Sequence, residues 1–269
     1  MKRVVSIVAS FVLAMSLFGC GVSEEHQVAN DAFQTEVDRL NIQVAERDSA
    51  IESADTLIAE SATPLDVELI SALETAVSDA KAVEVTIPQL PTKMEDVVSE
   101  TERLKAIDCT GVTQALNTAI DNLNISIQQY ALVDAPTEAY IIQCLQDLDH
   151  VVSYAAVTED NDPNGNLNKP KGYTSTVFYE CDLVDQTNLG GNDVIARGTD
   201  GGGSIEVYAT PEDAIQRSDY LSSFDGTPLA SGSRKVVGTV LVRTSDELTA
   251  SEQKLMEEIL VESLTRIRE

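Results

Sequence analysis

The spacing of hydrophobic residues changes near Pro136, and this change limits the folds that the chain can adopt. Before Pro136, apolar residues recur every three or four positions, which is typical of amphipathic helices. After it, short runs rich in β-branched and aromatic residues are separated by turn residues, which is typical of strands. The sequence therefore predicts a helical bundle or stalk, followed by an α+β part in which helices cover one face of an antiparallel sheet.

The helical half contains a heptad pattern typical of a coiled coil, interrupted by one charged residue, Arg47. The residues of this pattern are Phe33, Val37, Leu40, Val44, Arg47, Ile51, Ala54 and Ile58. The pattern ends at Ser61, and Thr63 followed by Pro64 predicts the cap of a second helix. Further helical patterns cover residues 70–80, 92–107 and 112–132.

The second half predicts the element order αβββαβα. The predicted helices cover residues 136–148, 210–222 and 249–267, and the predicted strands cover residues 151–158, 173–181, 204–208 and 234–243. Thr210 before Pro211 predicts a helix cap, and Thr249 with Glu252 predicts a capping box. The intervening Val133-Asp134-Ala135 is interpreted as a linker between a helical part, residues 33–132, and an α+β part, residues 136–269.

The first twenty residues have the pattern of an export signal. Lys2 and Arg3 precede an apolar run from Val4 to Phe18 that is too short for a permanent membrane helix. The following Leu17-Phe18-Gly19-Cys20 resembles the lipobox of bacterial lipoproteins, which implies a signal peptide over residues 1–19 and a diacylated Cys20. The expected location is the outer face of the cytoplasmic membrane, with residues 20–32 as a flexible anchored segment. The alternative is an ordinary secretory signal with a chance cysteine.

Two further resemblances concern the two halves of the chain. Residues 50–57 and 72–80 share an A-φ-x-x-A rhythm, repeated at 115–120, and the region 45–85 resembles the FIVAR-type repeats of Gram-positive surface proteins. That resemblance implies a spacer or adhesive stalk, while a plain antiparallel helical bundle explains the same residues. Segments such as Asn161–Lys169, Phe224-Asp225-Gly226 and Val242–Ser245 resemble an uncharacterised C-terminal α+β module of Gram-positive lipoproteins, which implies no known activity.

Charge and cysteine content restrict the partners. The chain has 45 acidic and 18 basic side chains, a net charge of −27, which excludes nucleic acid and disfavours anionic lipid head groups. The membrane is therefore expected to be contacted through the lipid on Cys20. Three other cysteines would face an oxidising compartment, and Cys109 with Cys144 is the predicted disulfide because both lie in or beside helices of the same half.

The best candidate for a cofactor site is a loop with the start of a calcium-binding pattern. Its oxygen-bearing residues are Asp160, Asp162, Asn164 and Asn168, with Gly165 at the sixth position. Lys171 occupies the twelfth position, where a bidentate glutamate is needed, and Asp162-Pro163-Asn164-Gly165 is also a favourable tight turn. Calcium and a purely structural turn are both compatible with this pattern, and no other cofactor is expected.

A candidate recognition patch follows from strand alternation. Glu206 and Tyr208 alternate with Ile205 and Val207, so they point away from the predicted core, where Arg243 can join them. On an uncovered sheet face these three residues would form a polar and aromatic binding patch, whereas the alternative is a cross-strand ion pair.

No motif of an enzyme class is present, and neither His26 nor His150 lies in a catalytic pattern. The sequence therefore predicts a cell-surface lipoprotein with a binding or structural role, adhesion or spacing, and no catalytic activity. The expected partner is an extracellular or cell-surface protein or glycan. The alternative is an extracellular enzyme that uses carboxylates of the α+β part. The βαβ alternation expected of a transporter's substrate-binding lipoprotein is absent.

Overall fold

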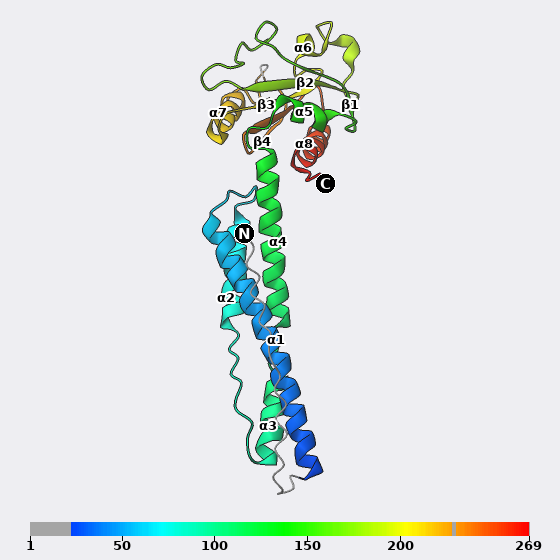
Figure 1. The fold of residues 1–269 in the computed structure, drawn as a ribbon. Coiled ribbons are helices and arrows are strands. Elements are labelled where there is room, and N and C mark those ends of the chain that lie inside the picture. The colour runs from blue at the N-terminus through cyan, green and yellow to red at the C-terminus, as the bar shows by residue number, and fades with distance from the viewer. Residues whose placement is uncertain (1–22, 228–229, 269) are drawn as a thin grey trace. The chain divides into compact units, whose positions relative to one another are not determined.

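The computed structural model describes residues 23–227 and 230–268 (Figure 1). The predicted signal peptide and Cys20 lie outside these residues. The helical region contains α1 (Glu24–Glu60), α2 (Glu68–Ala82), α3 (Met94–Lys105) and α4 (Thr110–Leu132). It is followed by α5 (Glu138–Leu145), β1 (Val151–Ala156), β2 (Ser175–Cys181), the 3-10 turn η1 (Gln186–Asn188), α6 (Val194–Arg197), β3 (Gly202–Val207), α7 (Pro211–Ser222), β4 (Arg234–Val237), β5 (Val240–Thr244) and α8 (Ala250–Thr265). The predicted fold class, α plus α+β, is confirmed.

The chain forms two compact units, and α1 contributes to both. The first unit contains residues 23–48 and 83–111, and the second contains residues 49–82 and 112–268. In the first unit, α1 packs on α3 through Phe33, Leu40, Val97 and Leu104, all at most 2 % exposed. Arg47 interrupts the heptad pattern at no cost in unpaired charge, because it donates to the Val83 carbonyl at 2.7 Å and pairs with Asp48.

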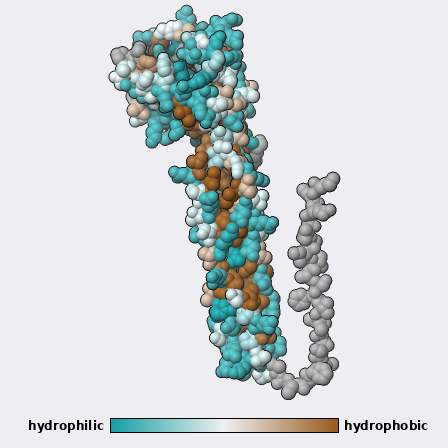
Figure 2. Space-filling model, turned by 90° about the vertical axis from the view of Figure 1, so that its left-hand side faces the viewer, coloured by the Kyte–Doolittle hydropathy of each residue, from teal (hydrophilic) through white to brown (hydrophobic). Residues whose placement is uncertain are grey.

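In the second unit, the three helical segments with the A-φ-x-x-A rhythm share one core. This core contains Ala50 and Ala54 of α1, Leu73, Val77 and Ala80 of α2, and Leu116 and Leu123 of α4. Alanine at a contact lets helix axes approach closely, which explains why the same rhythm recurs in three partners. Hydrophobic side chains accordingly follow the helices between hydrophilic ones, whereas the visible face of the α+β part is mainly hydrophilic (Figure 2). No helix in the described ranges is both long and apolar enough to cross a membrane.

The helix predicted to restart at Thr63 begins five residues later, at Glu68. Ser61 adopts a left-handed conformation with φ 52°, and the segment after Pro64 is held by α4 instead of forming a turn of helix. Leu65 donates its N–H to the Ser126 carbonyl and Asp66 donates to the Ser126 hydroxyl at 2.9 Å. A tertiary contact therefore satisfies backbone groups that a cap would otherwise serve.

The sheet has five antiparallel strands in the order β1-β2-β3-β5-β4. The single strand predicted over residues 234–243 is wrong, because β4 and β5 form a tight hairpin in which Val237 pairs with Val240. Gly238 sits in this turn with φ 60° and permits a close approach to the Val133 carbonyl. The valine-rich segment therefore forms two short paired strands joined by a turn, and not one long strand.

Both faces of the sheet are covered. Residues such as Tyr179, Ile205 and Val242 point toward α5 and α8, which lie side by side (Figure 1) and supply Ile141, Leu145, Met256, Leu260 and Leu264. Their neighbours Phe178 and Leu241 point to the other face, where they pack with Ala214 and Leu221 of α7 and with Tyr173 of the preceding loop. The prediction of one uncovered face is therefore wrong.

The segment predicted to be a linker is tied to the β4–β5 turn. Val133 is fully buried, and its carbonyl accepts from the Thr239 N–H at 2.9 Å and from the Thr239 hydroxyl at 3.0 Å. Ala135 donates its N–H to the same hydroxyl oxygen at 2.7 Å. The end of α4 is thereby joined to the sheet by three hydrogen bonds.

Candidate functional site

The three residues of the predicted recognition patch meet one another, but they are buried. The carboxylate of Glu206 on β3 accepts from Arg243 Nη1 on β5 at 2.8 Å and from the Tyr208 hydroxyl at 2.7 Å. Their exposed fractions are 0 % for Glu206, 1 % for Tyr208 and 5 % for Arg243. The expectation of an open patch fails because α7 and the loop of residues 157–173 lie over this face. The cross-strand ion pair, the second interpretation of the sequence, is the arrangement present.

A fourth residue that the sequence did not suggest, Arg217, joins this network from α7. Its Nε lies 3.4 Å from the second oxygen of Glu206, and its side chain is 15 % exposed. Burial alone would raise the pKa of Glu206, but the charges of Arg243 and Arg217 and the Tyr208 hydroxyl hold that pKa below its ordinary value. Two guanidinium groups face one carboxylate, so the network retains a positive charge on the side nearest α7.

The loop predicted as a calcium site is organised around Asp162. Its two carboxylate oxygens accept from the N–H groups of Asn164, Asn166 and Leu167 at 3.0, 2.7 and 2.8 Å, and from the Tyr173 hydroxyl. Burial would raise the pKa of Asp162, but these hydrogen bonds hold it below its ordinary value. Asp162 therefore acts as the organiser of a turn.

The other candidate calcium ligands are exposed or form hydrogen bonds of their own. Asp160 is exposed, and the Asn168 side-chain amide donates to Glu159 at 3.0 Å. Asn164 donates its backbone N–H to Asp162 at 3.0 Å. Because the Asp162 oxygens are already occupied by four donors, the hydrogen bonding argues against calcium, which stays a prediction of the sequence pattern alone.

A polar cleft of about 610 Å³ opens between this loop and α7, beside Arg217. It is lined by Asn164, Asn166 and Lys171 of the loop and by Asp213, Gln216, Arg217 and Tyr220 of α7. The α7 residues are spaced by three and four positions and therefore share one face of the helix. The Arg217 guanidinium carbon lies 5.6 Å from the centre of the Tyr220 ring, which is 56 % exposed. The cleft combines cations, amides and an aromatic surface.

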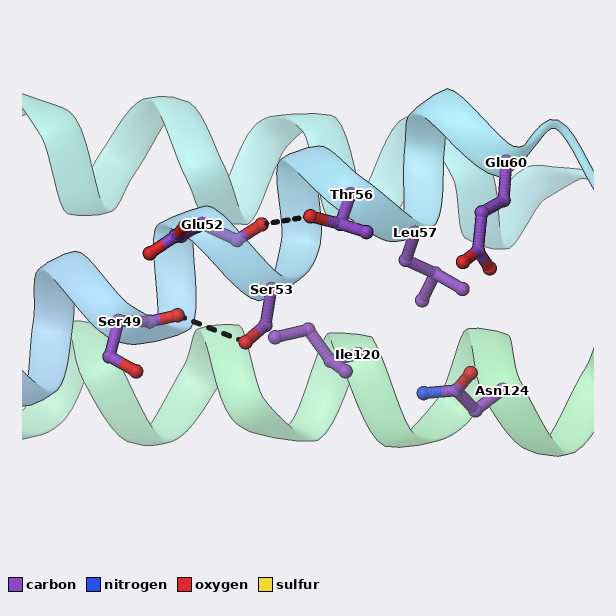
Figure 3. A pocket seen from close by; sticks show the side chains of 8 residues that line it. All are labelled: Ser49, Glu52, Ser53, Thr56, Leu57, Glu60, Ile120 and Asn124. Atoms are coloured by element: carbon purple, nitrogen blue, oxygen red, sulfur yellow. Dashed lines mark hydrogen bonds between the residues drawn. The ribbon is translucent and has the colours of Figure 1, made fainter. Parts of the chain in front are cut away.

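A second hollow lies between α1 and α4 in the helical region (Figure 3). Its volume is about 470 Å³, and Glu52, Glu60, Leu57, Ile120 and Asn124 are among its lining residues. The hydroxyls of Ser53 and Thr56 donate to the carbonyls of Ser49 and Glu52 within α1, as the dashed lines in Figure 3 show. Their protons are therefore engaged, and the groove offers chiefly carboxylates beside two apolar side chains.

The cysteines do not support the predicted disulfide. Cys144 is a buried free thiol, with Arg268 nitrogens 3.5 and 3.6 Å from its sulfur, which contradicts pairing with Cys109. The reason is that Cys109 precedes α4 and belongs to the first unit, whereas Cys144 follows α4 and belongs to the second. Cys181 is also buried, 3.8 Å from the Met256 sulfur, and burial raises its thiol pKa.

Other ionisable groups of the α+β part form local pairs. Glu180 accepts from Arg197 and from the Ser153 hydroxyl at 2.6 Å, and His150 Nδ1 lies 2.8 Å from Asp182. Across the described portion of the chain, histidine, cysteine and carboxylate side chains form no group of three suited to a metal ion. Comparison of the chain with family models, curated proteins and solved structures finds no match.

The cleft residues Lys171, Arg217 and Tyr220 were missed by sequence reasoning. The available signal was the polar face of the 210–222 helix, where Asp213, Gln216, Arg217 and Tyr220 recur at helical spacing. That pattern is shared by any solvated helix face. The loop residues that turn this face into a cleft precede it by 42 to 56 positions in the sequence, so their contribution depends on the tertiary fold.

Proposed function

We propose that this protein is an exported lipoprotein of the bacterial cell surface, anchored through Cys20, and that it binds a ligand through its α+β part. The basic residues, apolar run and lipobox-like Leu17–Cys20 support export and anchoring. The helices of residues 24–132 then act as the spacer between the lipid and the binding part. The resemblance of the C-terminal half to a module of Gram-positive lipoproteins also supports export and anchoring, although that module brings no known activity.

The observation that carries the binding role is the polar cleft beside α7, which stands on a buried charge network. Ligand sites need side chains whose positions are fixed before the ligand arrives. The loop side is held by the hydrogen bonds of Asp162, and the helix side is held by the contact between Arg217 and Glu206. Both walls of the cleft are thus preorganised.

Binding is favoured over catalysis because the buried carboxylate beside the cleft is already paired. Glu206 is held by the guanidinium groups of Arg243 and Arg217. A general acid or base needs a pKa near the working pH, whereas the pKa of Glu206 lies below its ordinary value. A carboxylate-based enzyme remains the alternative function, with Asp213 as the carboxylate that lines the cleft.

Fractionation of cells that express the full chain tests anchoring and display. The wild-type protein is expected in the membrane fraction, and its exposed lysines should react in intact cells with a membrane-impermeant amine reagent. Cys20→Ala should appear in the medium or as a longer precursor, because no acyl chain can be attached. The matched control is Cys181→Ala, which leaves the signal region unchanged. Unchanged mass and membrane partition of Cys20→Ala would refute lipid anchoring.

A further inference from the structure

The charge of the α7 cleft is opposite to that of the protein as a whole. Two of its three charged lining residues, Lys171 and Arg217, are cations, although acidic side chains outnumber basic ones 45 to 18 in the chain. Asp213, the third, accepts a hydrogen bond from Thr210 at the start of α7 and serves the helix cap. A local cationic surface in an acidic protein attracts an anionic group at close range.

Lys171 is available to such a group. It is exposed, and among the residues that the structure describes its ammonium group forms no ion pair. The backbone that carries it is fixed, because Lys171 has φ 63° and the next residue, Gly172, packs directly against the Asn166 carbonyl. A side chain at Gly172 would collide with that carbonyl, so the loop is built to hold this conformation.

Two neighbouring side chains, Glu206 and Tyr220, hold Arg217 in position. Glu206 contacts its Nε at 3.4 Å, and Tyr220 lies under its guanidinium plane. In the described ranges, the terminal Nη atoms of Arg217 donate to no other protein group, so they are the part of the side chain left for a ligand. A guanidinium with two parallel N–H donors is suited to a carboxylate.

The remaining lining residues suit a body rich in hydroxyl groups. Asn164, Asn166 and Gln216 each carry a planar amide with donors and an acceptor, which can bond neighbouring hydroxyls. Tyr220 is 56 % exposed, and the part of its ring that Arg217 and Phe224 leave uncovered can contact the C–H surface of a sugar ring. The cleft volume of about 610 Å³ lies within the range of about 300–1000 Å³ typical of small-ligand sites.

From these observations we propose that the α7 cleft binds an acidic saccharide, with Lys171 and Arg217 on its carboxylate and Tyr220 against its sugar ring. This assignment rests on the proposed binding function and names its ligand class. An acidic peptide would also meet the two cations and could bond the amides through its backbone, but tetraglutamate offers neither the hydroxyl groups nor the sugar C–H surface that Tyr220 would contact.

Titration calorimetry of the detergent-solubilised full-length protein tests the assignment with defined probes. The probes are tetragalacturonate, the neutral maltotetraose, and tetraglutamate as an acidic peptide. Tetragalacturonate is expected to bind at least about tenfold more tightly than either of the others, since only it supplies both the carboxylate and the hydroxyls. Equal binding of maltotetraose, equal binding of tetraglutamate, or no binding of tetragalacturonate would each overturn the acidic-saccharide assignment.

Matched lysine variants place the probe in the cleft. Lys171→Gln should weaken tetragalacturonate binding about tenfold or more, because a charged hydrogen bond is lost. Lys169→Gln removes the same charge two residues away, outside the cleft lining, and should change binding less than twofold. Tyr220→Leu should weaken it several-fold through loss of the ring face. Equal effects of the two lysine variants would contradict binding at this site.

The outcomes also separate this assignment from the proposed function. If the protein is surface-anchored and released by Cys20→Ala but does not bind tetragalacturonate, the ligand class is wrong and lipid anchoring stands. If tetragalacturonate binds in the lysine-dependent manner but Cys20→Ala stays in the membrane, the site is right and the lipid anchor is wrong.

Discussion

Replacement of Glu206 by glutamine is expected to be one of the most destabilising single changes in the α+β part. Glu206 is fully buried and accepts from Arg243, Arg217 and Tyr208. Glutamine preserves the shape but removes the charge, leaving Arg243, 5 % exposed, without its counter-ion. Breaking a buried pair on one side costs about 3–5 kcal/mol. The contribution of Arg217 is smaller, about 0–1 kcal/mol, because that side chain reaches solvent. The expected loss in unfolding free energy is therefore about 3–5 kcal/mol.

Equilibrium urea unfolding followed by tyrosine near-ultraviolet circular dichroism measures this loss. The chain has no tryptophan, and its seven tyrosines all lie between Tyr130 and Tyr220, so the signal reports on the part that contains Glu206. Glu258→Gln is the matched control, since its partner Lys254 is 3.7 Å away and both side chains are largely exposed. That variant should cost no more than about 1 kcal/mol. A loss below about 1 kcal/mol for Glu206→Gln would refute the reasoning.

The pH dependence supplies a second check of the same network. The pKa of Glu206 is lower in the folded chain than its ordinary value of 4.5, so its carboxylate contributes stability above pH 4.5. That contribution is lost as the pH falls from 4.5 through the folded pKa. The difference between wild type and Glu206→Gln should therefore shrink on acidification. A difference that grows below pH 4.5 would contradict the sign. In the Glu206→Gln variant, a second change, Arg243→Leu, should restore part of the lost unfolding free energy, because the two positions are coupled by about 1–3 kcal/mol.

Two further variants or measurements test the fold around the site. Gly238→Ala should cost about 2–4 kcal/mol of unfolding free energy, because its Cβ would lie 2.6 Å from the Val133 carbonyl oxygen. The control Gly226→Ala has φ 73° and open space around the new Cβ, so it should cost about 1–2 kcal/mol. Similar losses for the two variants would mean that the close approach at Gly238 is unimportant. Cys144 and Cys181 should react with a thiol reagent at pH 8 only after urea unfolding, because both are buried and burial raises the pKa of the Cys181 thiol. Reaction of either thiol in the native protein at the rate of free cysteine would contradict the packing between α5, α8 and the sheet.

Local features of the sequence were sufficient for the order and type of most elements. The heptad spacing from Phe33 to Ile58 is present in α1, and the caps at Thr210 and Thr249 start α7 and α8. The capping box is complete, with Glu252 accepting from the Thr249 N–H at 2.8 Å. These signals act within one or two turns of chain, which is why the fold class could be predicted without knowledge of the packing.

The functional site was predicted only in part, because local signals place residues on a strand face but do not show what packs on that face. Strand alternation correctly placed Glu206 and Tyr208 on the face opposite Ile205, and Arg243 beside them. Whether that face is open depends on α7 and the 157–173 loop, which pack on it from elsewhere in the chain. The sequence therefore identified the charged network but not its burial, and it did not identify the cleft that stands above it.

The sequence by itself determined the helical first half and most of the strands and helices of the second. Only the tertiary structure decided that the chain turns at Gly238 between β4 and β5, that Cys109 and Cys144 belong to different units, and that Val133 is hydrogen-bonded to Thr239. Periodicity and capping depend on neighbours a few residues apart, whereas each of these outcomes depends on residues brought together across tens of positions. Burial and pairing are properties of that second kind of contact.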